Sequence, residues 1–251
     1  MKKLFLLIAL LGVFLSFKAY AHPPQFNVLL FSETDGWHHQ SINEGVDALR
    51  AMAERHHFTV DWQEDSTVFN DERLKQYQAI VFLMTTGDIL TDEQQAAMER
   101  FIQSGKGFVG IHSASDTEYN WDWYTKMVGR TFHSHPFIQT AELRVLDQNF
   151  PGLARMPDHF LWTEEWYEFG KERIEGLNYI LAVDGSPFVK EGDDSEVADI
   201  FRPMAWYHEY DGGRAFYTAL GHLPSTFSDK LFREHIYGGL YWAATGKGLK
   251  D

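Results

Sequence analysis

The chain has 251 residues, a formal net charge of −14 and no cysteine. Without cysteine it has no disulfide, no thiol nucleophile and no thiolate ligand for a metal, so its stability has to come from a buried core. Because an acidic surface repels phosphate backbones, we expect no nucleic-acid partner.

The N-terminus has the pattern of a secretory signal peptide. Two lysines precede an apolar or small stretch at 4–17, and Ala-Tyr-Ala (19–21) has the small residues that signal peptidase recognises. The apolar stretch spans about 21 Å as a helix, which is short of the ~30 Å hydrocarbon core of a bilayer. We therefore expect cleavage before His22, a periplasmic or secreted protein, and no membrane attachment afterwards; an uncleaved membrane anchor is the alternative.

Residues 22–251 are expected to form one domain, because roughly 230 residues can bury a single large core. Cleavage of residues 1–21 removes three lysines and no acids, so the net charge falls from −14 to −17. No internal repeat, low-complexity tract or linker divides this length. The acidity is interpreted as solubility alone.

The first half of this domain alternates short apolar runs with amphipathic segments. The runs expected to be strands cover residues 26–31, 58–62, 79–84 and 107–111, and the expected helices cover residues 41–57, 71–77 and 91–105. Ser41 is the expected N-cap of the first helix, and Thr91 with Gln94 forms a capping box. Strands that are apolar on both faces and separated by helices predict an α/β fold, a doubly wound parallel sheet.

The second half is richer in strands joined by loops. The expected strands cover residues 139–146, 178–183, 203–208 and 214–220. Asp211-Gly212-Gly213 is a hairpin turn signal, and Ser228 is the expected N-cap of a last helix that ends near Gly246. We expect an antiparallel C-terminal extension of the parallel sheet.

The segments that follow the strands carry the histidines. In an open parallel sheet, ligands bind outside the carboxyl ends of the strands. The segments at these ends are residues 32–39, 85–88, 112–116 and 221–222, and three of the four contain histidine. We therefore expect a histidine-rich crevice in which His112 and His222 form an acid/base couple.

Longer segments make the chain recognisable. They are "DGWHHQSI" (35–42), "KGFVGIHSASDTEYNWDWY" (106–124), "FHSHP" (132–136), "TEEWYEF" (163–169), "PMAWYHEYDGGRAFYTALGH" (203–222) and "REHIYGGLYWAATG" (233–246). In these segments, and in their order, the chain resembles the ThuA (trehalose-utilisation) family. The resemblance implies a flavodoxin-like fold of the class I glutamine amidotransferase type and a role in the use of trehalose or related sugars, often beside oxidoreductases that act on sugars.

The same resemblance implies roles for His112 and His222. The amidotransferases carry a nucleophile elbow, Gly-x-Cys-x-Gly, and residues 110–114 are similar to it with His112 at the nucleophile position. His222 ends the "ALGH" segment, which looks like the place where the amidotransferases keep a general-base histidine. Since the cysteine is missing, glutaminase activity is excluded. Ser113 as a nucleophile is an alternative, although the glycines of a hydrolase elbow are absent around it.

The candidate site residues divide into two groups. The expected catalytic residues are His112, His222 and Glu165, and the expected substrate-binding residues are Trp37, His38, Ser113, Asp116, His135, Trp166, Tyr167 and His208. For the tryptophans, core packing is the competing interpretation, and Asp116 could instead cap a helix. His208 alternates with Trp206 along a strand and could reach the crevice.

A metal site is an open alternative. His133-Ser134-His135 with His38 and His39 offers enough ring nitrogens for a zinc-like divalent ion, although such pairs arise by chance in a chain with twelve histidines. No other cofactor is expected.

The leading hypothesis is a carbohydrate-active hydrolase, lyase or isomerase that uses histidine acid/base chemistry on a disaccharide or a keto-glycoside. A non-catalytic periplasmic carbohydrate-binding protein and a metal-dependent hydrolase are the alternatives. The expected partner is a small carbohydrate, and the helix surfaces could support a homodimer.

Overall fold

One large sheet forms the centre of the computed structural model, which describes residues 22–170, 174–184 and 201–249. Its strands are β1 (Asn27–Phe31), β2 (Thr59–Gln63), β3 (Ala79–Leu83), β4 (Gly107–Ile111), β6 (Gln139–Val145), β7 (His159–Glu164), β9 (Asn178–Asp184), β10 (Phe201–Tyr210) and β11 (Gly213–Thr218). They lie side by side in the order β2-β1-β3-β4-β11-β10-β9-β6-β7. Two short strands, β5 (Phe132–Ser134) and β8 (Glu168–Phe169), pair separately.

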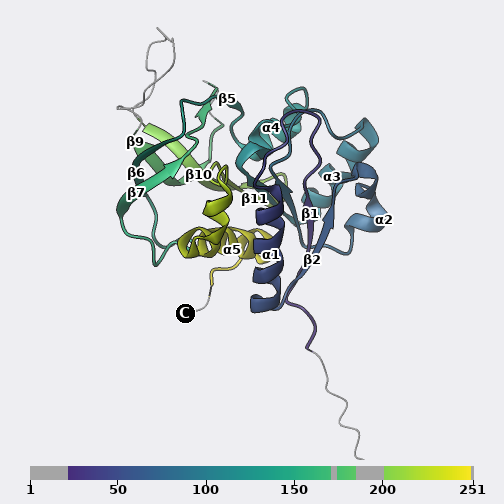
Figure 1. Cartoon of the computed structure of the whole chain (residues 1–251). Coiled ribbons are helices and arrows are strands. Elements are labelled where there is room, and N and C mark those ends of the chain that lie inside the picture. The colour runs from purple at the N-terminus through teal and green to yellow at the C-terminus, as the bar shows by residue number, and fades with distance from the viewer. Residues whose placement is uncertain (1–21, 171–173, 185–200, 250–251) are drawn as a thin grey trace, which may run out of the picture.

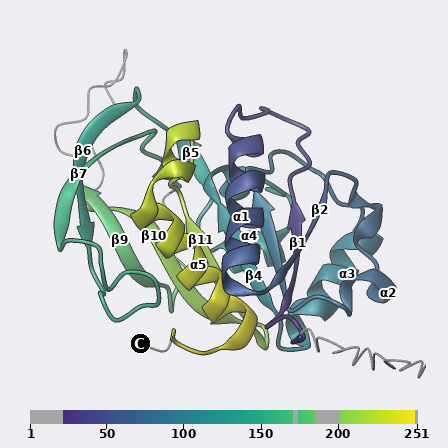
Figure 2. The ribbon, with the colours of Figure 1, turned by 60° about the horizontal axis from the view of Figure 1, so that its bottom comes forward.

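Helices cover both faces of this sheet (Figure 1). They are α1 (Ile42–His56), α2 (Asp71–Leu74), α3 (Asp92–Gln103), α4 (Asp122–Val128) and α5 (Lys230–Thr245), with the 3-10 turns η1 (Ser66–Val68), η2 (His112–Ser115) and η3 (Pro224–Ser228). Figure 2 shows α1 and α5 next to each other in front of the sheet, while α3 and α4 lie behind it. The doubly wound α/β fold predicted from the alternating pattern is therefore confirmed.

The parallel half of the sheet explains why its central strands are apolar. Strands β2, β1, β3, β4 and β11 run parallel to one another, and every residue of β3 and β4 is buried. Strands covered on both faces have no solvent side to carry polar residues. α5 packs so closely that a Cβ atom on Gly239 would lie 2.4 Å from the Phe216 ring.

The other half of the sheet is antiparallel, as predicted. β10 and β11 form a hairpin around Asp211, which has a positive φ of 46°, and Gly212. β10 then pairs with β9, β9 with β6, and β6 with β7. The expected strands correspond to β6, β9, β10 and β11 within about two residues, whereas β5, β7 and β8 were not predicted. β7 lies at the sheet edge and alternates exposed and less exposed residues, and its apolar run, 160–162, is only three residues long.

Two predicted helix caps are wrong, and one predicted helix is shorter than expected. Ser41 stands at the N-cap position of α1 but makes no capping hydrogen bond, because its hydroxyl binds the loop that carries His222. Asp229, not Ser228, caps α5, since its carboxylate accepts two backbone N–H groups. α2 ends at Leu74, whereas the capping box of Thr91 with Gln94 is present as predicted.

No helix among the described residues is long and apolar enough to cross a bilayer. The predicted signal peptide, residues 1–21, lies outside the described residues.

Candidate functional site

Three histidines and one glutamate meet at the carboxyl ends of the parallel strands. His39, His112, Glu165 and His222, here called the His–Glu cluster, each offer one ring nitrogen or carboxylate oxygen, and these four atoms lie within 4.8 Å of one another. They follow β1, β4, β7 and β11, respectively. The sheet therefore gathers residues that are far apart in the sequence, at the edge where such folds bind ligands.

His112 is held in place by its backbone and by one ring nitrogen. It lies at the turn from β4 into η2 with a positive φ of 53°, a strained conformation for a residue with a side chain. Its carbonyl oxygen accepts the Tyr217 hydroxyl at 2.6 Å. Its Nδ1 lies 2.8 Å from the carbonyl oxygen of Ala219. Since a carbonyl oxygen only accepts, Nδ1 carries a proton, and Nε2 is the ring nitrogen that points into the cluster.

The loop with His222 is fixed from two sides. The buried Ser41 hydroxyl donates to the carbonyl oxygen of His222 at 2.7 Å and approaches that of Gly221 at 3.1 Å. On the other side, Glu164 Oε2 accepts the Gly221 N–H at 3.0 Å and the Thr226 hydroxyl at 3.2 Å. The fully buried Glu164 thus joins the end of β7 to this loop and positions both Glu165 and His222.

Glu165 is the centre of the contacts within the cluster. Its Oε2 lies 3.2 Å from His222 Nδ1 and 3.4 Å from His112 Nε2, and these two nitrogens are 3.2 Å apart. Its other oxygen, Oε1, lies 3.3 Å from His135 Nε2. The Tyr167 hydroxyl lies 3.0 Å from His112 Nε2. Glu165 therefore binds three imidazoles.

The fourth member, His39, joins the cluster through Ser113. The Ser113 hydroxyl lies 3.3 Å from His39 Nδ1. The ring centroid of His39 is 4.8 Å from that of His112 and 5.5 Å from that of His222. Ser113 is buried and its hydroxyl contacts His39. The sequence had predicted that Ser113 contacts the substrate.

The charges of the cluster follow from burial and from Glu165. Burial raises the pKa of Glu165, but hydrogen bonds and charge interactions with His112 and His222 outweigh it, so the pKa lies below its usual range. Burial lowers the pKa of His222, and the hydrogen bond and charge of Glu165 reverse this into a net rise. Burial, reinforced by the neighbouring imidazoles, lowers the pKa of His39 to about 3. At neutral pH the carboxylate is therefore ionised and His39 is neutral.

The cluster opens to solvent on one side. The side chain of His112 is fully buried and that of Glu165 is 8% exposed, whereas His222 is 21% exposed and His135 is 44% exposed. A ligand would therefore meet His222 and His135 first and reach His112 last.

Two other predicted substrate-binding residues, Trp37 and Asp116, lie outside the cluster. Trp37 is 70% exposed, two residues before His39 in the chain. Asp116 accepts the Tyr119 hydroxyl at 2.7 Å; burial raises its pKa although this hydrogen bond opposes the rise. Gly87 N–H donates to the Asp116 carbonyl oxygen. Together with Tyr167 and His135, these residues stay candidates for contacts with a substrate.

The structure does not bring Trp166, His208 or His38 into the cluster. The Trp166 ring is fully buried and its Nε1 donates to the Gln139 carbonyl oxygen. The Nε2 of His208 lies 2.8 Å from the Met127 carbonyl oxygen. His38 is exposed and contacts Thr34. Core packing explains Trp166, and the neighbouring His39 occupies the position that the sequence interpretation gave to His38.

The sequence interpretation placed His39 only in the alternative metal site and did not include Glu164 among the catalytic or substrate-binding residues. Of two adjacent histidines after β1, only the contacts in the fold show which one points inward. The pair Glu164-Glu165 was a signal for one buried and one reactive carboxylate, but the sequence does not show that Glu164 binds the loop of His222.

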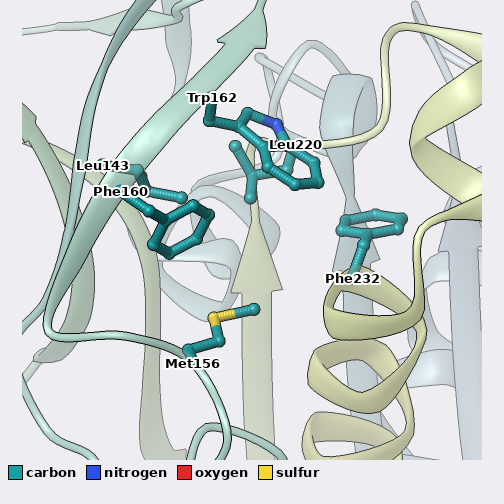
Figure 3. Close-up of a pocket in the computed structure, with 6 residues that line it drawn as sticks. All are labelled: Leu143, Met156, Phe160, Trp162, Leu220 and Phe232. Carbon is teal, nitrogen blue, oxygen red and sulfur yellow. The ribbon is translucent and has the colours of Figure 1, made fainter.

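An apolar hollow lies elsewhere in the molecule. Figure 3 shows its side chains pointing toward one another from β6, β7, the loop between them, the segment after β11 and α5; they are Leu143, Met156, Phe160, Trp162, Leu220 and Phe232. Its empty volume is about 150 Å³, which is below the size of ordinary ligand pockets. It contains none of the cluster residues and is not the candidate site.

Comparisons with known proteins point to one family. The model of the ThuA family, described as trehalose utilisation, matches residues 27–243. A ThuA-like protein from Bacteroides uniformis has a similar structure (TM-score 0.74, 20% identity, 89% of this chain and 93% of that chain covered). So does a ThuA-like protein from Parabacteroides merdae (TM-score 0.73, 18% identity, 92% and 93% covered).

A cytoplasmic protein from Salmonella typhimurium is more distant (TM-score 0.59, 10% identity, 86% and 98% covered). At these identities the structures support the shared fold alone. A comparison with curated proteins gives no significant match.

Proposed function

The chain belongs to the ThuA family, described as trehalose utilisation, and on that premise we propose that it is an enzyme acting on a disaccharide or a keto-glycoside at the His–Glu cluster. The family match supports a carbohydrate-related role. The observation that carries the enzymatic part is the convergence of His112, Glu165 and His222, with contacts of 3.2–3.4 Å between them. A binding protein needs no such group of ionisable side chains at its centre.

The proposed chemistry is proton transfer next to a sugar ketone. In a 3-keto-glycoside, the hydrogen on C2 is acidic because the enolate formed by its loss is stabilised by the C3 carbonyl. A base removes this proton, and the enolate then expels the glycosidic oxygen from C1. That oxygen takes up a proton and leaves as an alcohol, while the ring becomes an unsaturated keto sugar. No redox partner is needed.

The cluster and its two neighbours supply suitable groups for such a reaction. An ionised carboxylate, imidazoles and the Tyr167 hydroxyl lie within hydrogen-bonding range of one another, so a proton can be taken at one position and returned at another. Trp37, which is exposed and lies two residues before His39 in the chain, offers a flat ring for a pyranose face. Hydrolysis by the usual pair of separated carboxylates is less well supported, because Glu164 is fully buried and used to hold a loop.

The test is incubation of the protein with trehalose, simple glucosides and their 3-keto derivatives, followed by NMR. We expect turnover of at least one keto-glycoside, and a loss of about 100-fold or more in Glu165→Gln and His112→Ala. His38→Ala is the matched control and should keep wild-type turnover. Ligands that bind but stay unchanged would instead make the protein a carbohydrate-binding protein.

Export is part of the proposal. Residues 1–21 have the composition of a cleaved signal peptide, which would place the enzyme in the periplasm or outside the cell. N-terminal sequencing of the protein from its native host should begin at His22; a chain that begins at Met1 would contradict export by cleavage.

A further inference from the structure

We propose that the His–Glu cluster is a binding site for one divalent transition-metal ion of the zinc type. Imidazole nitrogens and carboxylate oxygens are the protein ligands that such ions prefer, and the cluster offers three of the first and one of the second. This proposal does not depend on the proposed function, because it concerns what the four side chains bind and not which substrate is converted.

The distances within the cluster match the spacing that an ion would impose. Ligands about 2.0–2.1 Å from a tetrahedral zinc ion lie roughly 3.3 Å from one another. The three edges between His112 Nε2, Glu165 Oε2 and His222 Nδ1 measure 3.4, 3.2 and 3.2 Å. The three atoms thus form a nearly equilateral triangle of the required size. His39 offers the fourth ligand atom, within 4.8 Å of the other three.

One ring nitrogen of His112 is left to face the triangle. Nδ1 of His112 lies 2.8 Å from the Ala219 carbonyl oxygen, and Nε2 is the ring nitrogen that faces Glu165 and His222. The Tyr167 hydroxyl lies 3.0 Å from the same Nε2. An ion in the triangle would replace these contacts by bonds to His112 Nε2, Glu165 Oε2 and His222 Nδ1.

The surroundings of the ligands resemble the outer contacts of known metal sites. Metal-binding histidines commonly use the second ring nitrogen to bind a carbonyl or another polar group, which fixes the ring orientation. His112 does this with Ala219, and His39 does it with the Ser113 hydroxyl at 3.3 Å. Glu165 uses its second oxygen to contact His135 at 3.3 Å. Three of the four ligands are therefore oriented before any ion binds.

The ion would change the assignment of roles in the proposed reaction. His112 and His222 become ligands, while Tyr167 and His135, which touch the cluster without belonging to it, remain free to move protons. The chemistry that such an ion supplies is polarisation of a ketone or hydroxyl oxygen of the sugar.

The test is zinc titration by calorimetry of protein that has been treated with a chelator and dialysed, with elemental analysis of the product. We expect about one ion per chain for the wild type. Glu165→Gln, which keeps the shape of the side chain, and His39→Ala should weaken binding by about 100-fold, since ligand loss exceeds the 10- to 100-fold effect of outer contacts. The matched control is His38→Ala, adjacent and exposed, which should keep wild-type affinity.

Several results would overturn the proposal. They are a wild type that binds no zinc, a His39→Ala variant that binds as tightly as His38→Ala, and a Glu165→Gln variant of wild-type affinity. Circular dichroism of each metal-free variant separates loss of a ligand from loss of the fold. If the protein binds zinc but converts no sugar, the proposed function is refuted and the metal site stands. If the protein binds no zinc and still converts a sugar after chelation, the metal site is refuted and the proposed function stands.

Discussion

Two regions of the molecule bury histidines in opposite ways. In the His–Glu cluster, His222 lies beside Glu165, whose hydrogen bond and charge overcome burial and raise the histidine pKa. At the interface between α5 and the sheet, His235 is fully buried beside Phe216 and Phe232, and its ring nitrogens have no hydrogen-bond partner among the residues that the structure describes. Burial alone lowers its pKa to about 3.

The difference shows what a carboxylate in direct contact adds: Glu165 reverses the effect of burial at His222, which is 21% exposed, whereas burial acts unopposed at His235 and outweighs the charge of Glu165 at His39. His235 packs as an apolar core residue. In the cluster, the buried imidazoles and the Glu165 carboxylate interact strongly because little water screens their charges.

The largest expected change in stability comes from replacing Glu164, one of the two carboxylates at the end of β7. Glu164 accepts three hydrogen bonds, from the N–H groups of Glu165 and Gly221 and from the Thr226 hydroxyl. In Glu164→Gln the amide nitrogen must face one of these donors, so we expect a loss of about 2–3 kcal/mol in the free energy of unfolding. Urea denaturation measures it.

Glu165→Gln is the comparison for this loss, since it makes the same isosteric change one residue away, where the carboxylate contacts the side chains of His112, His135 and His222. It should lower the free energy of unfolding by less than Glu164→Gln does, because the glutamine amide oxygen still accepts from an imidazole N–H. Equal losses in the two variants would remove the distinction between a structural and a functional carboxylate.

The second prediction tests His235 through pH. The unfolded chain binds a proton at this residue below pH 6.5, but the folded chain does so only near pH 3. The unfolded state therefore binds more protons between these values, and stability falls as the pH is lowered, by up to about 1.4 kcal/mol per pH unit. By pH 5 the contribution is about 2 kcal/mol.

His235→Leu removes this contribution, because leucine has a similar volume and no proton to bind. Thermal or urea unfolding of the variant should lose about 2 kcal/mol less than the wild type between pH 7 and pH 5. The exposed His38→Ala serves as control and should follow the wild type. Parallel profiles for His235→Leu and the wild type would show that the buried ring is protonated in the folded state.

The contrast between the regions also marks what the sequence could predict. The fold follows from local patterns: apolar runs such as β3 and the capping box of Thr91 with Gln94 lie where the sequence indicates. The meeting of His112 and His222 followed from the rule that strand ends share one edge. Neither inference requires knowledge of side-chain contacts.

The missed features depend on contacts between distant segments. Whether His38 or His39 points inward is decided by Ser113, and whether Ser41 caps a helix is decided by the loop 180 residues later. The sequence around His235 does not indicate that its ring has no hydrogen-bond partner among the described residues. Such choices are made by packing, which periodicity and spacing do not describe.

The smallest predicted effect tests how firmly the fold holds the cluster. Ser41 donates one buried hydrogen bond to the carbonyl oxygen of His222, so Ser41→Ala should lower the free energy of unfolding by about 1 kcal/mol. Ser104→Ala is the control, because the Ser104 hydroxyl binds the Phe101 carbonyl oxygen at 2.6 Å after α3, before β4 begins, whereas the cluster lies beyond the end of β4.

The two serine variants should lose similar stability, but only Ser41→Ala releases the backbone of His222. We therefore expect Ser41→Ala to weaken zinc binding several-fold, within the 10- to 100-fold range of outer contacts or just below it, while Ser104→Ala leaves the affinity unchanged. If both variants bind zinc equally well, the position of His222 is set by Glu164 and Glu165 without help from α1, and the hydroxyl contributes to stability alone.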